Sequence, residues 1–135
     1  QQADALTAFG QPLGRAFQYR DDVLGVFGDA ARTGKESGED LREGKLTLLA
    51  VEAFARATQP DAAELAGLFG RPGLDAAQVE RARGLIDASG ALDAVEAEIA
   101  REYDRALAAL ATPELTDAGR AGLAELARLA VARDF

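Results

Sequence analysis

The chain has 135 residues and a net charge of -8 at pH 7, with 23 acidic residues, 15 basic residues, no Cys and no His. This charge disfavours nucleic acids and anionic lipid surfaces as partners, because their binding depends on Lys and Arg neutralising phosphates. The composition also excludes disulfides, thiol catalysis, imidazole bases and the commonest transition-metal ligand, so hard cations with oxygen ligands remain.

The length and the apolar composition predict a single all-α domain over residues 1–135. Val and Ile together number only eight, whereas Ala is abundant, which favours closely packed helices over sheets. No apolar run approaches the ~20 residues of a membrane span, and no signal peptide pattern opens the chain, so we expect a cytoplasmic protein.

The chain opens with Gln1 rather than Met, and a helical pattern starts almost at once. We therefore expect that part of the protein precedes this chain.

The first predicted helix covers about residues 4–27, where apolar side chains recur mostly at three- and four-residue steps. Pro12 predicts a kink or a later start, since a proline inside a helix costs ~3 kcal/mol. Residues 28–44 are polar, rich in glycine and without apolar periodicity, so we expect a mobile surface loop. Loops longer than ~12–15 residues are uncommon unless they are functional.

A central helix packed on all sides is expected at residues 45–58, which are apolar on several faces. Shorter helices are expected at residues 62–69 and 75–89, the second with Asp75 as its N-cap and Gly90 as its terminator.

Two amphipathic helices complete the prediction. Apolar side chains from Leu92 to Leu110 are spaced three, four, four, three and four residues apart, which is typical of one helical face. Thr116 is placed to cap a last helix. Its expected inward residues are Leu123, Leu126 and either Leu129 or Ala130.

Two adjacent acids and the only two Lys of the sequence lie within one predicted helix and one predicted loop. The acids are Asp21 and Asp22, and the lysines are Lys35 and Lys45, whereas the other basic residues are all Arg. A compact ammonium suits a phosphate oxygen. Two carboxylates ~5 Å apart repel by about 3 kcal/mol at an effective dielectric constant of ~20, and Mg²⁺ would relieve this repulsion while leaving positions for phosphate oxygens. We therefore predict a polyanion held through Mg²⁺.

Each part of this set has an ordinary structural explanation when it is taken alone. A pair of Asp on a helix is usually solvated, a lone Phe17 is more often a core residue, and Thr33-Gly34-Lys35 without a preceding strand is not a nucleotide-binding loop. The order of the parts along the chain is what favours a functional site.

The ordered set resembles the second aspartate-rich region of the trans-isoprenyl diphosphate synthases, also called polyprenyl synthetases. The family pattern runs approximately GxxLGxAFQxxDDxLDxxGD and then TGKxxGxDLxxGKxTL. Residues 10–29 read GQPLGRAFQYRDDVLGVFGD, and residues 33–48 read TGKESGEDLREGKLTL. Residues 82–86 and 89–92 also resemble the C-terminal half of that family, so the likeness covers nearly the whole chain. It implies the C-terminal portion of the isoprenoid synthase helical bundle.

The resemblance also implies a role for each site residue. Asp21 would bind Mg²⁺ directly, and Asp22 would support the metal or its waters. The allylic prenyl diphosphate would contact Lys35 and Lys45, and its isoprenoid tail would occupy a pocket bordered by Phe17 and Gln18. In the parent prenyltransferase, metal ions and Lys neutralise the leaving diphosphate, isopentenyl diphosphate attacks the allylic cation, and a proton is lost.

Two departures from the family pattern keep alternatives open. The third aspartate of DDxxD is Gly25 here, and Asp29, one turn farther along, cannot be assumed to replace it. The first aspartate-rich region and the basic residues for isopentenyl diphosphate would lie in an N-terminal half that this chain lacks. We therefore expect the chain alone to be nearly inactive, and a homodimer to form through that half.

A non-catalytic helical subunit or interaction module of the same fold is the alternative function. A terpene cyclase is less well supported, because its usual metal-binding triad is not found after Asp22.

Overall fold

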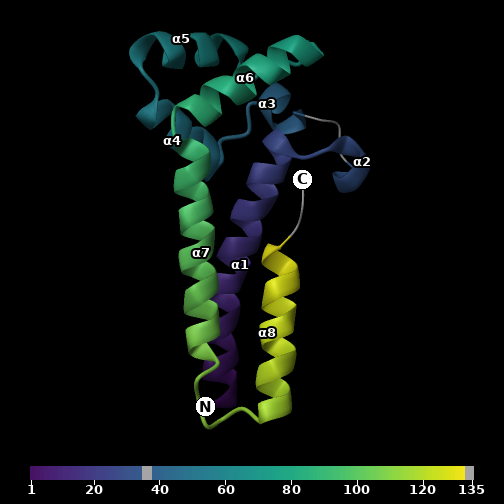
Figure 1. Cartoon of the computed structure of the whole chain (residues 1–135), viewed down its shortest axis with the longest axis vertical. Coiled ribbons are helices and arrows are strands. Elements are labelled where there is room, and N and C mark those ends of the chain that lie inside the picture. Colours follow the sequence, from purple (N-terminus) through teal and green to yellow (C-terminus); the bar gives the residue numbers. More distant parts are fainter. Residues whose placement is uncertain (35–37, 133–135) are drawn as a thin grey trace. The chain divides into compact units, whose positions relative to one another are not determined.

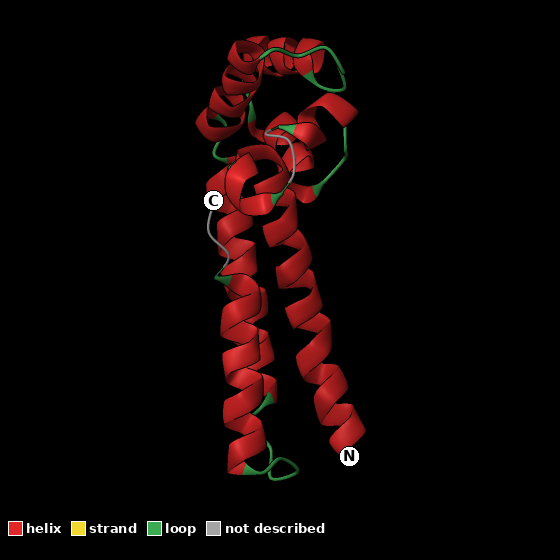
Figure 2. Cartoon of the chain, turned by 90° about the vertical axis from the view of Figure 1, so that its right-hand side faces the viewer, coloured by secondary structure: helices red, strands yellow, loops and turns green. Residues whose placement is uncertain are grey.

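The computed structural model describes residues 1–34 and 38–132, and this part of the chain contains helices and no strand (Figure 1, Figure 2). The all-helical prediction is therefore confirmed. The helices are α1 (Gln2–Phe27), α2 (Ala30–Thr33), α3 (Glu39–Glu43), α4 (Leu48–Arg56), α5 (Gln59–Leu68), α6 (Ala76–Ala88), α7 (Ala91–Ala109) and α8 (Asp117–Val131).

The described residues form two compact units. The first unit contains residues 1–20 and 97–132, and the second unit contains residues 21–96. The boundaries fall within α1 and α7, so each of these helices contributes one part to each unit. No described helix is long and apolar enough to cross a membrane.

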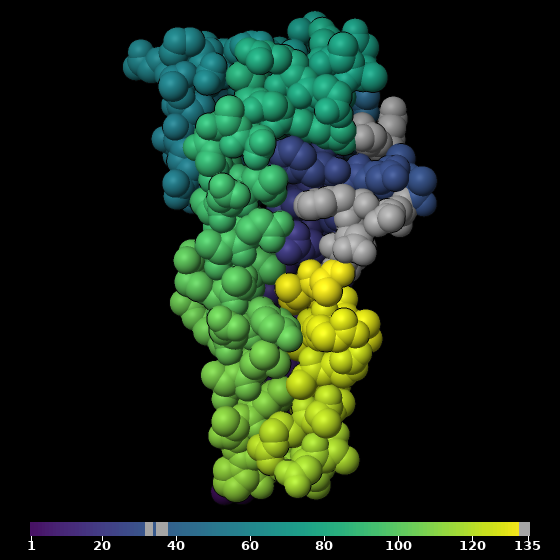
Figure 3. Space-filling model, viewed as in Figure 1, coloured from purple at the N-terminus to yellow at the C-terminus, as the bar shows by residue number. Residues whose placement is uncertain are grey.

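The first unit has a small apolar core made by three helices. Phe9 of α1, Ala106 of α7 and Ala127 of α8 are buried in it together with Leu110. In the space-filling view, α8 in yellow lies along α7 in green (Figure 3). These buried residues belong to the apolar stripe of each helix, which explains why the three helices associate.

The expected inward face of α8 is only partly correct. Leu123 packs against the core of the first unit. Leu126 and Leu129 are instead 54% and 57% exposed, whereas Ala127 is fully buried. The small Ala127 lets α8 approach its neighbours closely, and Ala130, the expected alternative to Leu129, is half-buried.

In the second unit, α4, α5 and α6 pack on one another (Figure 1). The rings of Phe54 and Phe69 meet edge to face, with centroids 5.5 Å apart, where α4 approaches the end of α5. Glu64 of α5 and Arg81 of α6 form two hydrogen bonds of 2.6 and 2.7 Å. Aromatic packing and this ion pair thus join the three helices.

Residues 28–44 do not form the expected surface loop throughout. Asp29 caps α2 by accepting a 3.0 Å hydrogen bond from the Ala31 N–H. Gly38 and Gly44 adopt left-handed backbone conformations, with φ of 75° and 66°, on either side of α3. The glycines thus begin and end short helices. Leu41 is 1% exposed, which anchors α3 in the core of the second unit.

Two further expectations are corrected by the bounds of the helices. α1 begins at Gln2 with Pro12 inside it, so the expected late start is wrong. α4 begins only at Leu48, because the Thr47 hydroxyl caps it by accepting the Ala50 N–H at 3.2 Å. Leu46 and Val51 are 73% and 47% exposed, so residues 45–58 are not packed on all sides.

The remaining helix predictions are confirmed within a few residues. Asp75 and Gln78 form a reciprocal capping box at the start of α6. Gly90 adopts a left-handed conformation between α6 and α7, with φ of 84°. Thr116 caps α8, as expected.

Candidate functional site

Three charged side chains of the second unit meet where α1, α3 and the segment after α3 come together. Lys45 Nζ lies 3.8 Å from Asp22 Oδ1 and 3.9 Å from Asp40 Oδ2. Both Asp side chains are 7% exposed, whereas the Lys45 side chain is 46% exposed. We call Asp22, Asp40 and Lys45 the Lys45 cluster. It places one ammonium beside two buried carboxylates.

The backbone around Gly44 brings Lys45 to this position. Gly44 ends α3 in a left-handed conformation, and the Lys45 N–H donates a 3.0 Å hydrogen bond to the Asp40 carbonyl. The chain therefore reverses immediately after α3. A Cβ at Gly44 would lie 2.9 Å from Gly70 Cα, so two glycine backbones are in close contact there. Gly70 donates a 2.8 Å hydrogen bond to the Leu41 carbonyl beside this contact.

Asp40 reaches α1 at the position of Gly25. A Cβ on Gly25 would lie 2.0 Å from Asp40 Oδ2 and 2.4 Å from Asp40 Cγ, distances at which atoms cannot coexist without a shift. The Asp40 carboxylate thus occupies the space that a side chain at residue 25 would need. Sequence reasoning did not assign Asp40 to the site, although the residue lies within the quoted GEDL segment. Its burial in a glycine-rich stretch is visible only in the fold.

Of the other four predicted site residues, the structure describes Phe17, Gln18 and Asp21. Asp21 lies next to Asp22 on α1 and is half-buried. Phe17 is 41% exposed and Gln18 is exposed, and both belong to the part of α1 in the first unit. Lys35 lies outside the described residues. The second unit therefore brings together Asp22 and Lys45 of the predicted set, and adds Asp40.

The acidic side chains of the Lys45 cluster fit a hard divalent cation that takes further ligands from elsewhere. Across residues 1–34 and 38–132 there is no group of three or more acidic side chains able to enclose a metal ion. Mg²⁺ commonly binds through one or two carboxylates and completes its shell with waters and phosphate oxygens. Asp40 Oδ2 is buried and accepts no hydrogen bond within the described part of the chain, so it retains unused lone pairs.

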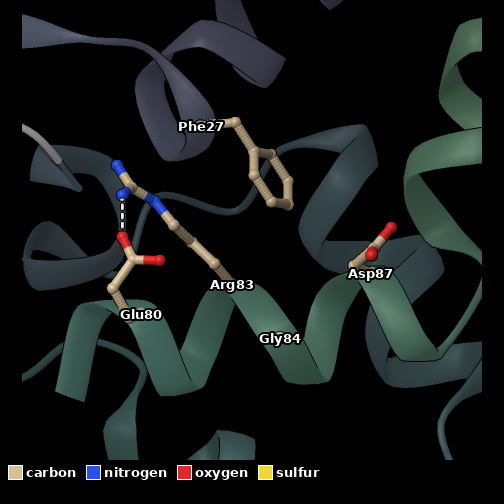
Figure 4. A pocket seen from close by; sticks show the side chains of 5 residues that line it. All are labelled: Phe27, Glu80, Arg83, Gly84 and Asp87. Atoms are coloured by element: carbon tan, nitrogen blue, oxygen red, sulfur yellow. Dashed lines mark hydrogen bonds and ion pairs between the residues drawn. The ribbon is translucent and has the colours of Figure 1, made fainter. Parts of the chain in front are cut away.

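A separate hollow of about 260 Å³ in the second unit is lined by Phe27, Glu80, Arg83, Gly84 and Asp87 (Figure 4). Arg83 donates to Glu80 and, through Nε at 2.6 Å, to the Val26 carbonyl. The lining of the hollow carries two carboxylates and one guanidinium. This net charge of -1 disfavours the binding of a diphosphate. None of the predicted site residues lines this hollow.

Comparison with known proteins identifies similar chains. The family model described as polyprenyl synthetase matches residues 1–86, which include every predicted site residue. A geranylfarnesyl diphosphate synthase of Aeropyrum pernix is 39% identical over 109 residues, covering 81% of this chain and 33% of the relative. An all-trans-nonaprenyl-diphosphate synthase (geranyl-diphosphate specific) of Rhodobacter capsulatus is 37% identical, covering 96% of this chain and 39% of the relative.

Solved structures show the same similarity. A geranylgeranyl pyrophosphate synthase from Corynebacterium glutamicum, complexed with isoprenyl diphosphate and magnesium, superposes with a TM-score of 0.92 at 38% identity. That match covers 97% of this chain and 37% of the solved one. A polyprenyl synthase from Caulobacter crescentus, complexed with calcium and isoprenyl diphosphate, gives 0.83 at 43% identity. The chain thus spans between a third and two fifths of the length of these relatives.

Proposed function

Because the chain belongs to the polyprenyl synthetase family, we propose that it forms one metal-binding side of the active site of a trans-isoprenyl diphosphate synthase. The parent enzyme would condense an allylic prenyl diphosphate with isopentenyl diphosphate to give a longer prenyl diphosphate. Support comes from relatives whose structures hold isoprenyl diphosphate with magnesium or calcium.

The Lys45 cluster is the observation that carries this proposal. It combines the anionic oxygens that hold a hard cation with the ammonium that meets a phosphate oxygen. Mg²⁺, when bound, would neutralise negative charge on the leaving diphosphate. Asp21 and Asp22 would face the cation, and Lys45, with Lys35, would bind the diphosphate. Burial of the carboxylates strengthens these interactions, because the local dielectric constant is lower than that of water.

The test is a Mg²⁺-dependent condensation assay on the full-length protein that contains this chain, with an allylic diphosphate and isopentenyl diphosphate as substrates. We expect Asp21→Ala to lower kcat by about 10²–10³-fold, the range for removal of one group that stabilises developing charge. Asp4→Ala, which removes an exposed acid from the same helix, is the matched control and should leave kcat unchanged.

Two results would contradict the proposal. One is an intact protein that forms no prenyl diphosphate under these conditions. The other is an active protein in which Asp21→Ala and Asp4→Ala have the same effect on kcat. The first result would favour the non-catalytic subunit. The second would mean that the metal ion does not bind at Asp21 of α1.

A further inference from the structure

We propose that the hollow between the end of α1 and the face of α6 binds a small organic cation with a guanidinium head group. The hollow lies in the second unit and is lined by Phe27, Glu80, Arg83, Gly84 and Asp87 (Figure 4). None of the residues of the Lys45 cluster lines it, so this inference does not rest on the proposed condensation.

Gly84 keeps the hollow open. A Cβ at Gly84 would meet no atom within 4 Å outside the backbone of its own helix, although the residue lies inside α6, where glycine is less favourable than alanine. The ring of Phe27 points from the end of α1 toward this part of α6 (Figure 4). The volume of about 260 Å³ is below the ~300–1,000 Å³ of pockets that enclose a drug-sized molecule. The hollow is therefore suited to a head group rather than to a whole large ligand.

Asp87 supplies the negative charge for a cation. Glu80 and Arg83 form an ion pair, and Arg83 Nε also donates a 2.6 Å hydrogen bond to the Val26 carbonyl. The Arg83 side chain is only 15% exposed, and its guanidinium lies on the side of Glu80 rather than of Asp87 (Figure 4). Asp87 is exposed, and across residues 1–34 and 38–132 its carboxylate forms neither a hydrogen bond nor an ion pair. One negative charge of the hollow is thus left without compensation.

Two helices end at this hollow. α1 ends at Phe27, α6 ends at Ala88, and neither helix has a basic residue in its last turn. The C-terminal end of a helix carries a partial negative charge, which favours cations and disfavours acids. Asp87 therefore lies where its own helix opposes its charge. A cation in the hollow would offset the carboxylate and the two helix ends together.

An aromatic ring near a carboxylate suits a guanidinium in particular. A guanidinium is planar, stacks on aromatic faces and can donate two parallel hydrogen bonds to one carboxylate. It could stack on Phe27 and donate to Asp87 at the same time. An ammonium is a compact, strongly hydrated charge without a flat face. We therefore expect an alkylguanidinium to bind more tightly than an alkylammonium.

The test titrates propylguanidinium into the full-length protein that contains this chain and follows the ligand by saturation-transfer NMR. Propylurea, which is neutral and has nearly the same shape, is the ligand control and should not bind. Asp87→Asn should raise the Kd for propylguanidinium about fivefold, the factor for loss of an exposed ion pair at the upper end of the usual range. Asp93→Asn removes another exposed acid of the second unit and should leave the Kd unchanged.

Filling the hollow tests the site without changing its charge. Gly84→Leu places a good helix former where the structure has open space, so it should not lower the unfolding temperature and should abolish binding of propylguanidinium. Asp87→Asn should likewise keep or raise the unfolding temperature, because an acid is unfavourable at the C-terminal end of a helix. If Gly84→Leu does not fold, the result for Asp87→Asn decides.

Three results would overturn the proposal. They are no binding of propylguanidinium to the wild type, equal binding of propylguanidinium and propylurea, and a Kd that Asp87→Asn changes no more than Asp93→Asn does. Asp21→Ala, which removes the proposed metal ligand, should leave this Kd unchanged, so failure of the proposed function would not affect the result.

N-acetylarginine amide distinguishes two sources of the cation. Binding as tight as that of propylguanidinium would mean that an arginine side chain of another protein fits the hollow. Binding of propylguanidinium alone would identify the ligand as a free guanidinium compound. The guanidinium site stands in both cases.

Discussion

Gly25 has a different meaning in the structure from its meaning in the sequence. In the sequence, Gly25 stands where the family motif has its third aspartate, and this difference supports the non-catalytic alternative. In the fold it is the position at which the Asp40 carboxylate meets the backbone of α1. A side chain at residue 25 would therefore require the Asp40 carboxylate to shift.

Gly44 offers a prediction at the level of one residue. Gly44→Ala should destabilise the protein by at least about 1–2 kcal/mol, the cost of a left-handed conformation in a residue with a Cβ. Collision of that Cβ with the Gly70 backbone, 2.9 Å away, adds to the loss because a backbone cannot move aside cheaply. Urea unfolding measures the change in the free energy of unfolding.

Gly90→Ala is the control for Gly44→Ala, since Gly90 has a φ of 84° and nothing within 4 Å of its Cβ position. It isolates the conformational cost from the collision. Equal losses of stability in the two variants would show that contact with Gly70 contributes nothing.

Helices α5 and α6 are joined by an ion pair whose contribution depends on pH. The hydrogen bonds from Arg81 hold the pKa of Glu64 below its ordinary value of 4.5. Because the carboxyl pKa is lowered on folding, its stabilisation is complete above 4.5 and is lost as the pH falls through the lowered pKa. We expect Glu64→Gln to lower the unfolding temperature slightly at neutral pH, with a difference from the wild type that vanishes well below 4.5.

Thermal unfolding at several pH values measures this difference. Glu125→Gln provides a comparison, since Arg128 likewise lowers the pKa of Glu125, but within one helix. A difference between Glu64→Gln and the wild type that persists unchanged in acid would mean that side-chain packing, rather than charge, links α5 to α6.

The sequence was a sufficient guide to those helices whose apolar side chains repeat over several turns. Residues 92–110 repeat over five turns and form α7 almost as predicted, and Asp75 caps α6 because a cap depends on neighbours within one turn. α2 and α3, with four and five residues, are too short to display a period, so the glycines around them resembled a loop. Their positions depend on capping and on burial of Leu41.

The same distinction applies to the candidate site. Asp22 and Lys45 could be chosen from the sequence because their residue types and order carry chemical information. Asp40 also occupies an Asp position of the family pattern, but its residue type alone does not separate it from a solvated acid. Its burial beside Gly25, 15 residues earlier in the chain, appears only in the second unit of the fold.

At the scale of the whole chain, the net charge of -8 disfavours an anionic ligand such as diphosphate unless a cation accompanies it. We expect inorganic diphosphate with Mg²⁺ to stabilise the full-length protein by about 2.7 kcal/mol at a hundredfold excess over Kd, and diphosphate with EDTA to give almost no stabilisation. Thermal unfolding with each pair of additives measures this.

Mg²⁺ alone and EDTA alone are the controls for that comparison. Stabilisation by diphosphate of the same size with and without EDTA would mean that Lys and Arg side chains bind the anion directly. The divalent cation would then have no part in holding it.

The position of Lys45 also affects how the protein can fold before any metal ion is bound. Two acids that fold into a poorly solvated site would oppose folding if no cation were near them. The Lys45 ammonium offsets part of that negative charge. If Mg²⁺ binds as proposed, it would enter a site where a cationic side chain is already present, so folding would not have to wait for the metal.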